Sequence, residues 1–200
     1  MASVNYALKE ISCKVVYYGP GMCGKTTSLQ YIHQHTALDK KGNLVSLATP
    51  GERTLFFDFL HLEASQIHGF RTRFQLYTVP GQVMYNSTRR LVLRGVDGVI
   101  FVCDSQWEKM RENVESFRNL QENLASYGYN LETTPYVVQY NKRDLPNTSP
   151  QNYLQYVINP RQLLSFTSVA ISGEGVFETL NAICHLVLVN LRSKQKEGAL

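Results

Sequence analysis

The sequence predicts an α/β fold: a mostly parallel sheet with one antiparallel edge strand and helices on both faces. Three observations lead to this fold class. Short apolar, β-rich runs alternate with longer segments whose apolar residues recur every three or four positions. A glycine-rich turn separates the first such run from the first helical segment. The 200 residues are 44% hydrophobic and 18% charged, which suits one domain with its own core.

The elements follow in order along the chain. The expected strands are residues 11–18, 55–62, 70–79, 98–104, 135–140 and 166–171. The expected helices are residues 25–35, 85–94, 107–127, 151–164 (interrupted at Pro160) and 176–191. A turn near Gly69 joins residues 55–62 to 70–79, so these two strands form the antiparallel pair. Residues 36–54 have little periodicity and contain Pro50 and Gly51, which predicts a long functional loop. The apolar stripe of residues 176–191 is expected to face the core rather than a partner.

Composition and termini exclude several classes of protein. Twenty Lys and Arg against sixteen Asp and Glu give a net charge of +4, too weak a bias for a nucleic-acid binder. The spacing of the four cysteines, Cys13, Cys23, Cys103 and Cys184, suggests no disulfide framework or zinc site. The chain has no apolar run of membrane-spanning length, no signal peptide and no lipidation motif. We therefore expect a cytoplasmic protein without a direct lipid anchor, monomeric when free.

A phosphate-binding loop follows the first predicted strand and precedes the first predicted helix. The pattern G-x-x-x-x-G-K-[ST] is matched by Gly19-Pro20-Gly21-Met22-Cys23-Gly24-Lys25-Thr26. Such a loop turns successive backbone N–H groups toward a triphosphate, and its glycines allow the backbone to approach closely. The residues expected to bind the phosphates are Gly19, Gly21, Met22, Cys23, Gly24, Lys25, Thr26 and Thr27. Lys25 should reach the β and γ phosphates, and the Thr26 hydroxyl should ligate Mg²⁺. Cys23 is expected to fill a variable position rather than to sense redox state.

A second motif selects the base of the nucleotide. Asn141-Lys142-Arg143-Asp144 directly follows the strand predicted for residues 135–140. The Asp144 carboxylate can accept two hydrogen bonds from guanine, whereas adenine has no donor there and would leave the carboxylate unpaired. Asn141 can bond N7 of the base, and the aliphatic stem of Lys142 can cover the face of the base. An ATP-using kinase or transport ATPase would leave this motif unexplained, so we expect GTP and GDP.

The sequence resembles the Ras-like small GTPases over nearly its whole length, which implies a P-loop G-domain fold. In the third base-binding loop, Val169-Ala170-Ile171 replaces the usual Ser-Ala-Lys. The resemblance implies that the Ala170 backbone N–H binds the guanine O6 and that Ile171 lies beside the base. Most of the superfamily has Asp-x-x-Gly-Gln near the γ-phosphate, where this chain has Thr78-Val79-Pro80-Gly81-Gln82. The aspartate that helps to hold Mg²⁺ is thus a threonine, which can still bond a metal-bound water.

This departure resembles the bacterial MglA (mutual gliding-motility) family of Ras-like GTPases. The similar blocks, within a match from about residue 5 to 191, are 17–21, 52–60, 76–82 and 141–146. The resemblance implies that Arg53 acts as an arginine finger in cis, Thr54 closes on Mg²⁺ and Gln82 positions the attacking water, next to Gly81 at the γ-phosphate. It also implies an activator, the Roadblock-type MglB dimer, and effectors of polarity and of gliding or type IV pili that recruit the protein to a cell pole.

The sequence as a whole predicts a GTP-hydrolysing molecular switch in one G domain, residues 1–200, with a core of about 5–191 and a flexible tail of 192–200. GTP and Mg²⁺ would order residues 36–54 and 82–94. The alternative is a nucleotide-gated binding module with negligible hydrolysis, which Thr78 in place of the aspartate would permit. Arg89, Arg90 and Arg94 form a basic cluster beside the second segment. That cluster is either a solvated helix face or a contact for an acidic partner.

Overall fold

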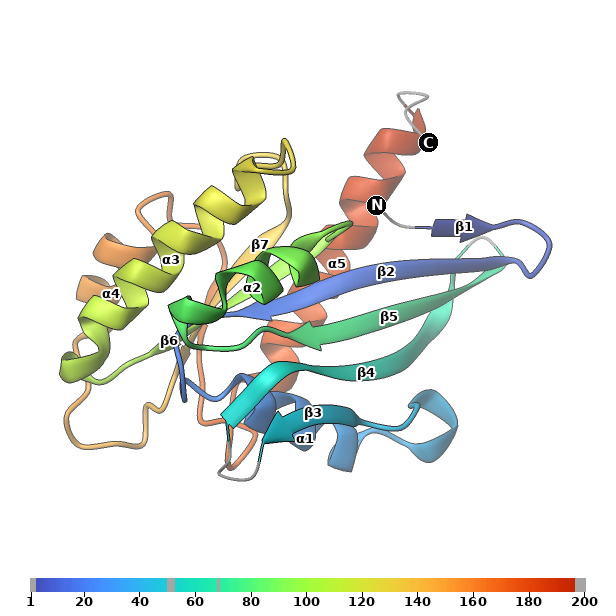
Figure 1. Ribbon diagram of the computed structural model, residues 1–200. Coiled ribbons are helices and arrows are strands. Elements are labelled where there is room, and N and C mark those ends of the chain that lie inside the picture. The colour runs from blue at the N-terminus through green and yellow to red at the C-terminus, as the bar shows by residue number, and fades with distance from the viewer. Residues whose placement is uncertain (1–2, 50–52, 68, 197–200) are drawn as a thin grey trace.

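A computed structural model describes residues 3–49, 53–67 and 69–196, and is built around one mixed sheet (Figure 1). The strands follow the spatial order β3-β4-β5-β2-β6-β7-β8, and β1 pairs with β2 beside this path. Their bounds are β1 Ser3–Asn5, β2 Glu10–Tyr18, β3 Val45–Thr49, β4 Arg53–Ile67, β5 Phe70–Thr78, β6 Gly98–Asp104, β7 Tyr136–Asn141 and β8 Ser165–Thr167. The pairs β2–β5, β2–β6, β6–β7 and β7–β8 are parallel. The α/β fold class predicted from the alternating pattern is thereby confirmed.

The antiparallel part of the sheet is larger than one edge strand. β4 pairs with β5 as predicted, but β3 also pairs antiparallel with β4, and β1 with β2. The prediction of a loop over residues 36–54 is therefore wrong, because this segment contains the short helix η1 (Leu38–Lys40) and β3. β3 is only five residues long, too short for its own pattern to predict a strand. It forms because the long strand β4 offers it an edge to pair with, from Val45 opposite Phe59 to Thr49 opposite Arg53.

Five α-helices cover the two faces of the sheet in the described part of the chain. They are α1 Lys25–His35, α2 Asn86–Leu93, α3 Met110–Ala125, α4 Gln151–Ile158 and α5 Val176–Lys196. The short 3₁₀ helices η2 (Val83–Tyr85) and η3 (Trp107–Lys109) precede α2 and α3. α2, α3 and α4 lie on one face, and α1 and α5 on the other (Figure 1). Residues 192–196, expected in a flexible tail, continue α5, and residues 197–200 lie outside the described residues.

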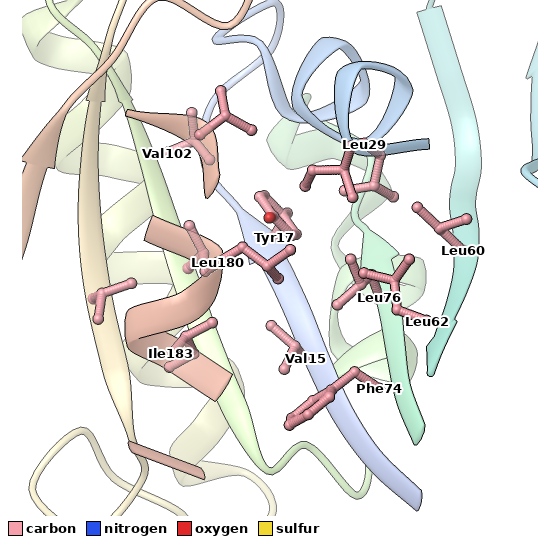
Figure 2. Packing of buried hydrophobic residues seen from close by; sticks show 14 of the residues in the cluster. Val15, Tyr17, Leu29, Leu60, Leu62, Phe74, Leu76, Val102, Leu180 and Ile183 are labelled. Atoms are coloured by element: carbon pink, nitrogen blue, oxygen red, sulfur yellow. The ribbon is translucent and has the colours of Figure 1, made fainter. Parts of the chain in front are cut away.

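Each face of the sheet has its own apolar core because side chains alternate along β2. Val15 and Tyr17 face α1 and α5, whereas Val16 and Tyr18 face α2, α3 and α4. Figure 2 shows the first core, where Tyr17 lies among residues of β2, α1 and α5. The stripe of α5 is buried in this core, as the sequence predicts, through Val176, Leu180, Ile183 and Val187.

The carboxyl ends of the parallel strands point to one edge of the sheet. The loops that leave β2, β6, β7 and β8 there carry the phosphate-loop motif, residues 105–106, the base motif and residues 168–175. In open α/β sheets, ligands bind at this edge. None of the helices described here is both long and apolar enough to cross a bilayer. All four cysteines are free thiols, three of them buried and Cys184 half-buried.

Candidate nucleotide-binding site

The phosphate loop runs from the end of β2 to the start of α1, with glycines where the backbone is most crowded. Gly19 has φ +148°, and a Cβ on it would lie 2.2 Å from the Val102 carbonyl oxygen. Gly24 has φ +102°, and a Cβ there would lie 2.1 Å from Nδ2 of Asn141. The first turn of α1 contains no acidic residue, so no carboxylate from this turn competes with an anion for its backbone N–H groups. The loop is thus a close-packed turn in front of a helix N-terminus, which suits a phosphate group.

Lys25 brings a buried positive charge into this loop. Its Nζ donates to the carbonyl oxygens of Pro20 (2.6 Å) and Gly19 (3.3 Å), and only 6% of the residue is exposed. Burial lowers the pKa of Lys25, which means that its charged form lacks full compensation by its surroundings. An anion at the loop would supply that compensation. Burial raises the pKa of the neighbouring Cys23 thiol, which fits a space-filling role better than a redox role.

Asn141 connects three loops at the edge of the sheet. Its Nδ2 donates to the Cys23 carbonyl in the phosphate loop (2.8 Å). Its Oδ1 accepts from the Ala170 N–H (2.9 Å) and from the Ser168 hydroxyl (3.0 Å) in the third base loop. The Ala170 N–H, expected to bind a guanine carbonyl, is therefore already bonded, and a guanine O6 would have to share it with Asn141. The residue after it, Ile171, is 82% exposed.

The rest of the base motif lies beside Asn141. Lys142 has φ +64°, and its ammonium forms an ion pair with the buried carboxylate of Asp104 (2.7 Å) at the end of β6. Sequence reasoning missed Asp104, although an acidic residue that ends an apolar strand was a signal. The ion pair fixes one end of the Lys142 stem and so limits where the stem can lie. Asp144 is exposed at the same edge, where its carboxylate can accept hydrogen bonds.

The segment after β5 rests directly on the phosphate loop. Thr78, at the end of β5, is fully buried. A Cβ on Gly81 would lie 2.2 Å from Cα of Gly21, so only glycine allows these two backbones to touch. The side chain of Gln82 is next to the same loop, since its Cγ lies 4.0 Å from the position of a Cβ on Gly21. The structure therefore brings Gly81 and Gln82 against the phosphate loop.

The burial of Arg89 differs from what the sequence suggests. Arg90 and Arg94 are exposed, but Arg89 is fully buried, so the three arginines do not form one surface cluster. The Arg89 guanidinium donates to the Tyr18 hydroxyl (3.1 Å), the Ser116 hydroxyl (2.7 Å) and the Gly81 carbonyl (3.3 Å), and it stacks over the Tyr18 ring. It therefore joins α2 to β2, to α3 and to the segment on the phosphate loop. The sequence could not separate it from Arg90 because both occur in the same polar helix.

We expect Arg89→Met to lower the free energy of unfolding by about 1–3 kcal/mol, the cost of leaving buried acceptors unpaired. The loss is limited because methionine fills the space and does not need a buried charge. Arg90→Met on the exposed face of α2 is the matched control and should stay within about 0.5 kcal/mol of the original protein. Urea denaturation measures both, and equal midpoints for the two variants would contradict the role given to Arg89.

The candidate metal ligands lie at the start of α1 and on the neighbouring strands. Thr26 Oγ1 donates to Oδ2 of Asp58 (2.6 Å), and Thr78 Oγ1 donates to the same oxygen (2.8 Å). Hydroxyl and carboxylate oxygens are the donors that Mg²⁺ prefers, so the residues fit a magnesium ion. Sequence reasoning missed Asp58, although an acidic residue inside the apolar run of residues 55–60 was a signal. The side chains of Arg53 and Thr54 lie outside the described residues, so their expected roles stay predictions.

Comparisons with known proteins agree with this geometry. The chain matches the ADP-ribosylation factor family over residues 2–187, which includes the phosphate loop and all the base-loop residues described above. It is 56% identical to the mutual gliding-motility protein MglA of Myxococcus xanthus (strain DK1622) over 192 residues, 96% of this chain and 98% of that protein. The resemblance drawn from the motifs is thereby confirmed. The chain belongs to the ADP-ribosylation factor family and is an MglA-like small GTPase, so it binds guanine nucleotides.

Proposed function

We propose that this GTPase is a molecular switch whose nucleotide site is the edge of the sheet where Asn141 joins three loops. The hydrogen bonds of Asn141 to Cys23, Ser168 and Ala170 form this joint, and they are the observation that carries the proposal. They hold the phosphate-binding and base-binding segments in a fixed relative position. The phosphates bind the backbone of residues 19–27 and the ammonium of Lys25. The base lies between the Lys142 stem and residues 170–171, and Asp144 accepts its two donors.

Magnesium binding and catalysis use residues around the γ-phosphate position. The hydroxyls of Thr26 and Thr54 hold Mg²⁺, which when bound neutralises charge on the phosphates. Gln82 orients the attacking water beside Gly81, and the Arg53 guanidinium stabilises the negative charge that develops in the transition state. The contact of Gly81 with Gly21 supports this assignment, because it brings residues 81–82 to the phosphate loop. GTP and Mg²⁺ order residues 36–54 and 82–94, and hydrolysis releases these segments again.

The proposed cellular role is control of polarity and motility. The support is the 56% identity to a protein named for gliding motility, over nearly the whole length of both chains. The proposed partners are a Roadblock-type activator dimer like MglB, which stimulates hydrolysis, and motility effectors that bind one nucleotide state. These partners recruit the protein to a cell pole.

Titration of the nucleotide-free protein with GTP, GDP and ATP tests the guanine assignment. We expect ATP to bind at least about 10³-fold more weakly, because adenine would leave the Asp144 carboxylate unpaired. Asp144→Ala should remove most of this discrimination, whereas Glu122→Ala on the exposed face of α3 should keep it. Comparable affinities for ATP and GTP would overturn the assignment.

Single-turnover phosphate release, with and without a candidate activator, tests the switch itself. Release that speeds up with the activator is expected. A protein that binds GTP but releases no phosphate under either condition would instead be a nucleotide-gated binding module.

A further inference from the structure

Asp58 is a buried carboxylate on which three elements converge. It lies in β4 between Phe57 and Phe59 and is fully buried. Besides the hydroxyls of Thr26 in α1 and Thr78 in β5, the hydroxyl of Ser46 in β3 donates to its carboxylate. A charge this deep in the protein is costly unless several donors hold it. The sequence therefore maintains an expensive carboxylate next to the first residues of α1.

The direction of the hydrogen bonds gives Asp58 a chemical effect. Thr26 Oγ1 donates a hydrogen bond to Asp58, and a hydroxyl that acts as a donor uses none of its lone pairs in that bond and can turn them toward a cation. A ligand that donates a hydrogen bond to a carboxylate is oriented by it and becomes a stronger donor to a metal ion. The charge of Asp58 also lowers the local potential at this position, which favours a divalent cation.

The pairing of β4 with β5 connects Asp58 to the unusual Thr78. Because Phe59 lies opposite Tyr77, Asp58 lies opposite Thr78 on the neighbouring strand. The two residues are bonded twice: the Asp58 N–H donates to Thr78 Oγ1 (2.8 Å), and this hydroxyl donates to the Asp58 carboxylate. Thr78 stands where most Ras-like GTPases have an aspartate, and here it orients a carboxylate that comes from the next strand.

We infer that Asp58 supplies from β4 the magnesium-supporting carboxylate that most Ras-like GTPases carry at the position of Thr78. Asp58 is a positioning residue: it orients Thr26 toward the ion and offers its oxygens to metal-bound water. The inference rests on the proposed magnesium site at Thr26. It explains how the chain can keep a magnesium-dependent site without the aspartate that most Ras-like GTPases have.

The test is the Mg²⁺ dependence of the release of fluorescent mant-GDP, which requires no hydrolysis. In Asp58→Asn, the Mg²⁺ concentration that half-maximally slows release should rise by about 10–100-fold, as when other partners of metal ligands are removed. The release rate in EDTA should stay close to that of the original protein. Glu122→Gln removes an exposed carboxylate on α3 and is the matched control.

Two further variants keep the inference falsifiable if Asp58→Asn folds poorly. The exchange Asp58→Thr with Thr78→Asp moves the carboxylate back to β5, and it should restore the Mg²⁺ dependence. Thr78→Val removes only the hydroxyl that orients Asp58. It should raise the Mg²⁺ concentration that half-maximally slows release by about fivefold, the equivalent of one hydrogen bond.

The outcomes separate this inference from the proposed function. Equal acceleration of release with and without Mg²⁺ in Asp58→Asn would reduce Asp58 to a structural role and overturn the inference. An unchanged Mg²⁺ dependence would also overturn it. A lower half-maximal Mg²⁺ concentration in Asp58→Asn would overturn it too, because the carboxylate would then compete with the ion. If the original protein itself shows no Mg²⁺ dependence, the proposed magnesium site fails together with the inference.

Discussion

Replacement of Arg53 by alanine is expected to slow stimulated GTP hydrolysis by about 10³–10⁵-fold, the range found for arginines that stabilise phosphoryl transfer. The affinity for GTP should change by less than about threefold, because the charge that Arg53 stabilises develops only in the transition state. Arg53→Lys should recover little of the rate, since an ammonium cannot reproduce the planar fork of a guanidinium. Single-turnover phosphate release measures the rates, and mant-GDP competition measures the affinities.

Gln82→Ala should act on the same step with a smaller effect, about 10²–10³-fold, as for other single donors in active sites.

Arg71→Ala is the control for the positive charge lost in Arg53→Ala, because Arg71 is exposed near the start of β5, far along the strand from Thr78. It should leave the rate unchanged. Unchanged turnover in both Arg53→Ala and Gln82→Ala would refute the catalytic assignments, even if nucleotide binding is as proposed.

Gly24→Ala is expected to weaken binding of both GTP and GDP by on the order of 10²–10³-fold. Left-handed backbone costs a residue with a Cβ about 1–2 kcal/mol. The new Cβ would also lie 2.1 Å from Asn141 Nδ2, and overpacking of this kind costs about 1–3 kcal/mol. Each 1.4 kcal/mol is about a tenfold change in affinity. In the free protein the loop backbone and the Asn141 side chain shift to relieve both the strain and the clash. Nucleotide binding has to restore the original geometry, so the cost is subtracted from the affinity.

Gly128→Ala separates the clash from the strain. Gly128 has φ +74°, but a Cβ there would have no atom within 4 Å. This control should lower stability by about 1 kcal/mol and leave nucleotide affinity unchanged. Isothermal titration with GDP and thermal unfolding of each variant measure the two effects. Equal affinities of Gly24→Ala and Gly128→Ala would mean that the Asn141 joint does not matter for binding.

The sequence predicts the parts of this fold that local patterns determine. β2, α1 and β6 agree with their predicted bounds to within one residue, because apolar runs and helical spacing depend on near neighbours. The phosphate loop is equally local, since its glycines, lysine and threonine are adjacent in the chain. β3 could not be predicted in this way, because it is only five residues long and forms by pairing with β4.

The residues that the sequence interpretation missed are all defined by long-range contacts. Arg89 is buried because Tyr18 and Ser116, from two other elements, accept its hydrogen bonds. The role of Asp104 is recognised only from its ion pair with Lys142, and that of Asp58 only from the hydroxyls that three other elements donate to it. A buried charge in an apolar or polar run indicates a partner, but the sequence does not say which residue that partner is.

The joint at Asn141 has a further consequence for how tightly a nucleotide can bind. Its bonds to the Cys23 carbonyl, the Ala170 N–H and the Ser168 hydroxyl are made entirely within the protein. The entropy of aligning two distant loops is therefore lost when the chain folds and not when the ligand arrives. A site preorganised in this way retains more of its contact energy as affinity. The stability of the fold and the affinity of the site are thus partly the same free energy, so variants that loosen this joint should lower both together.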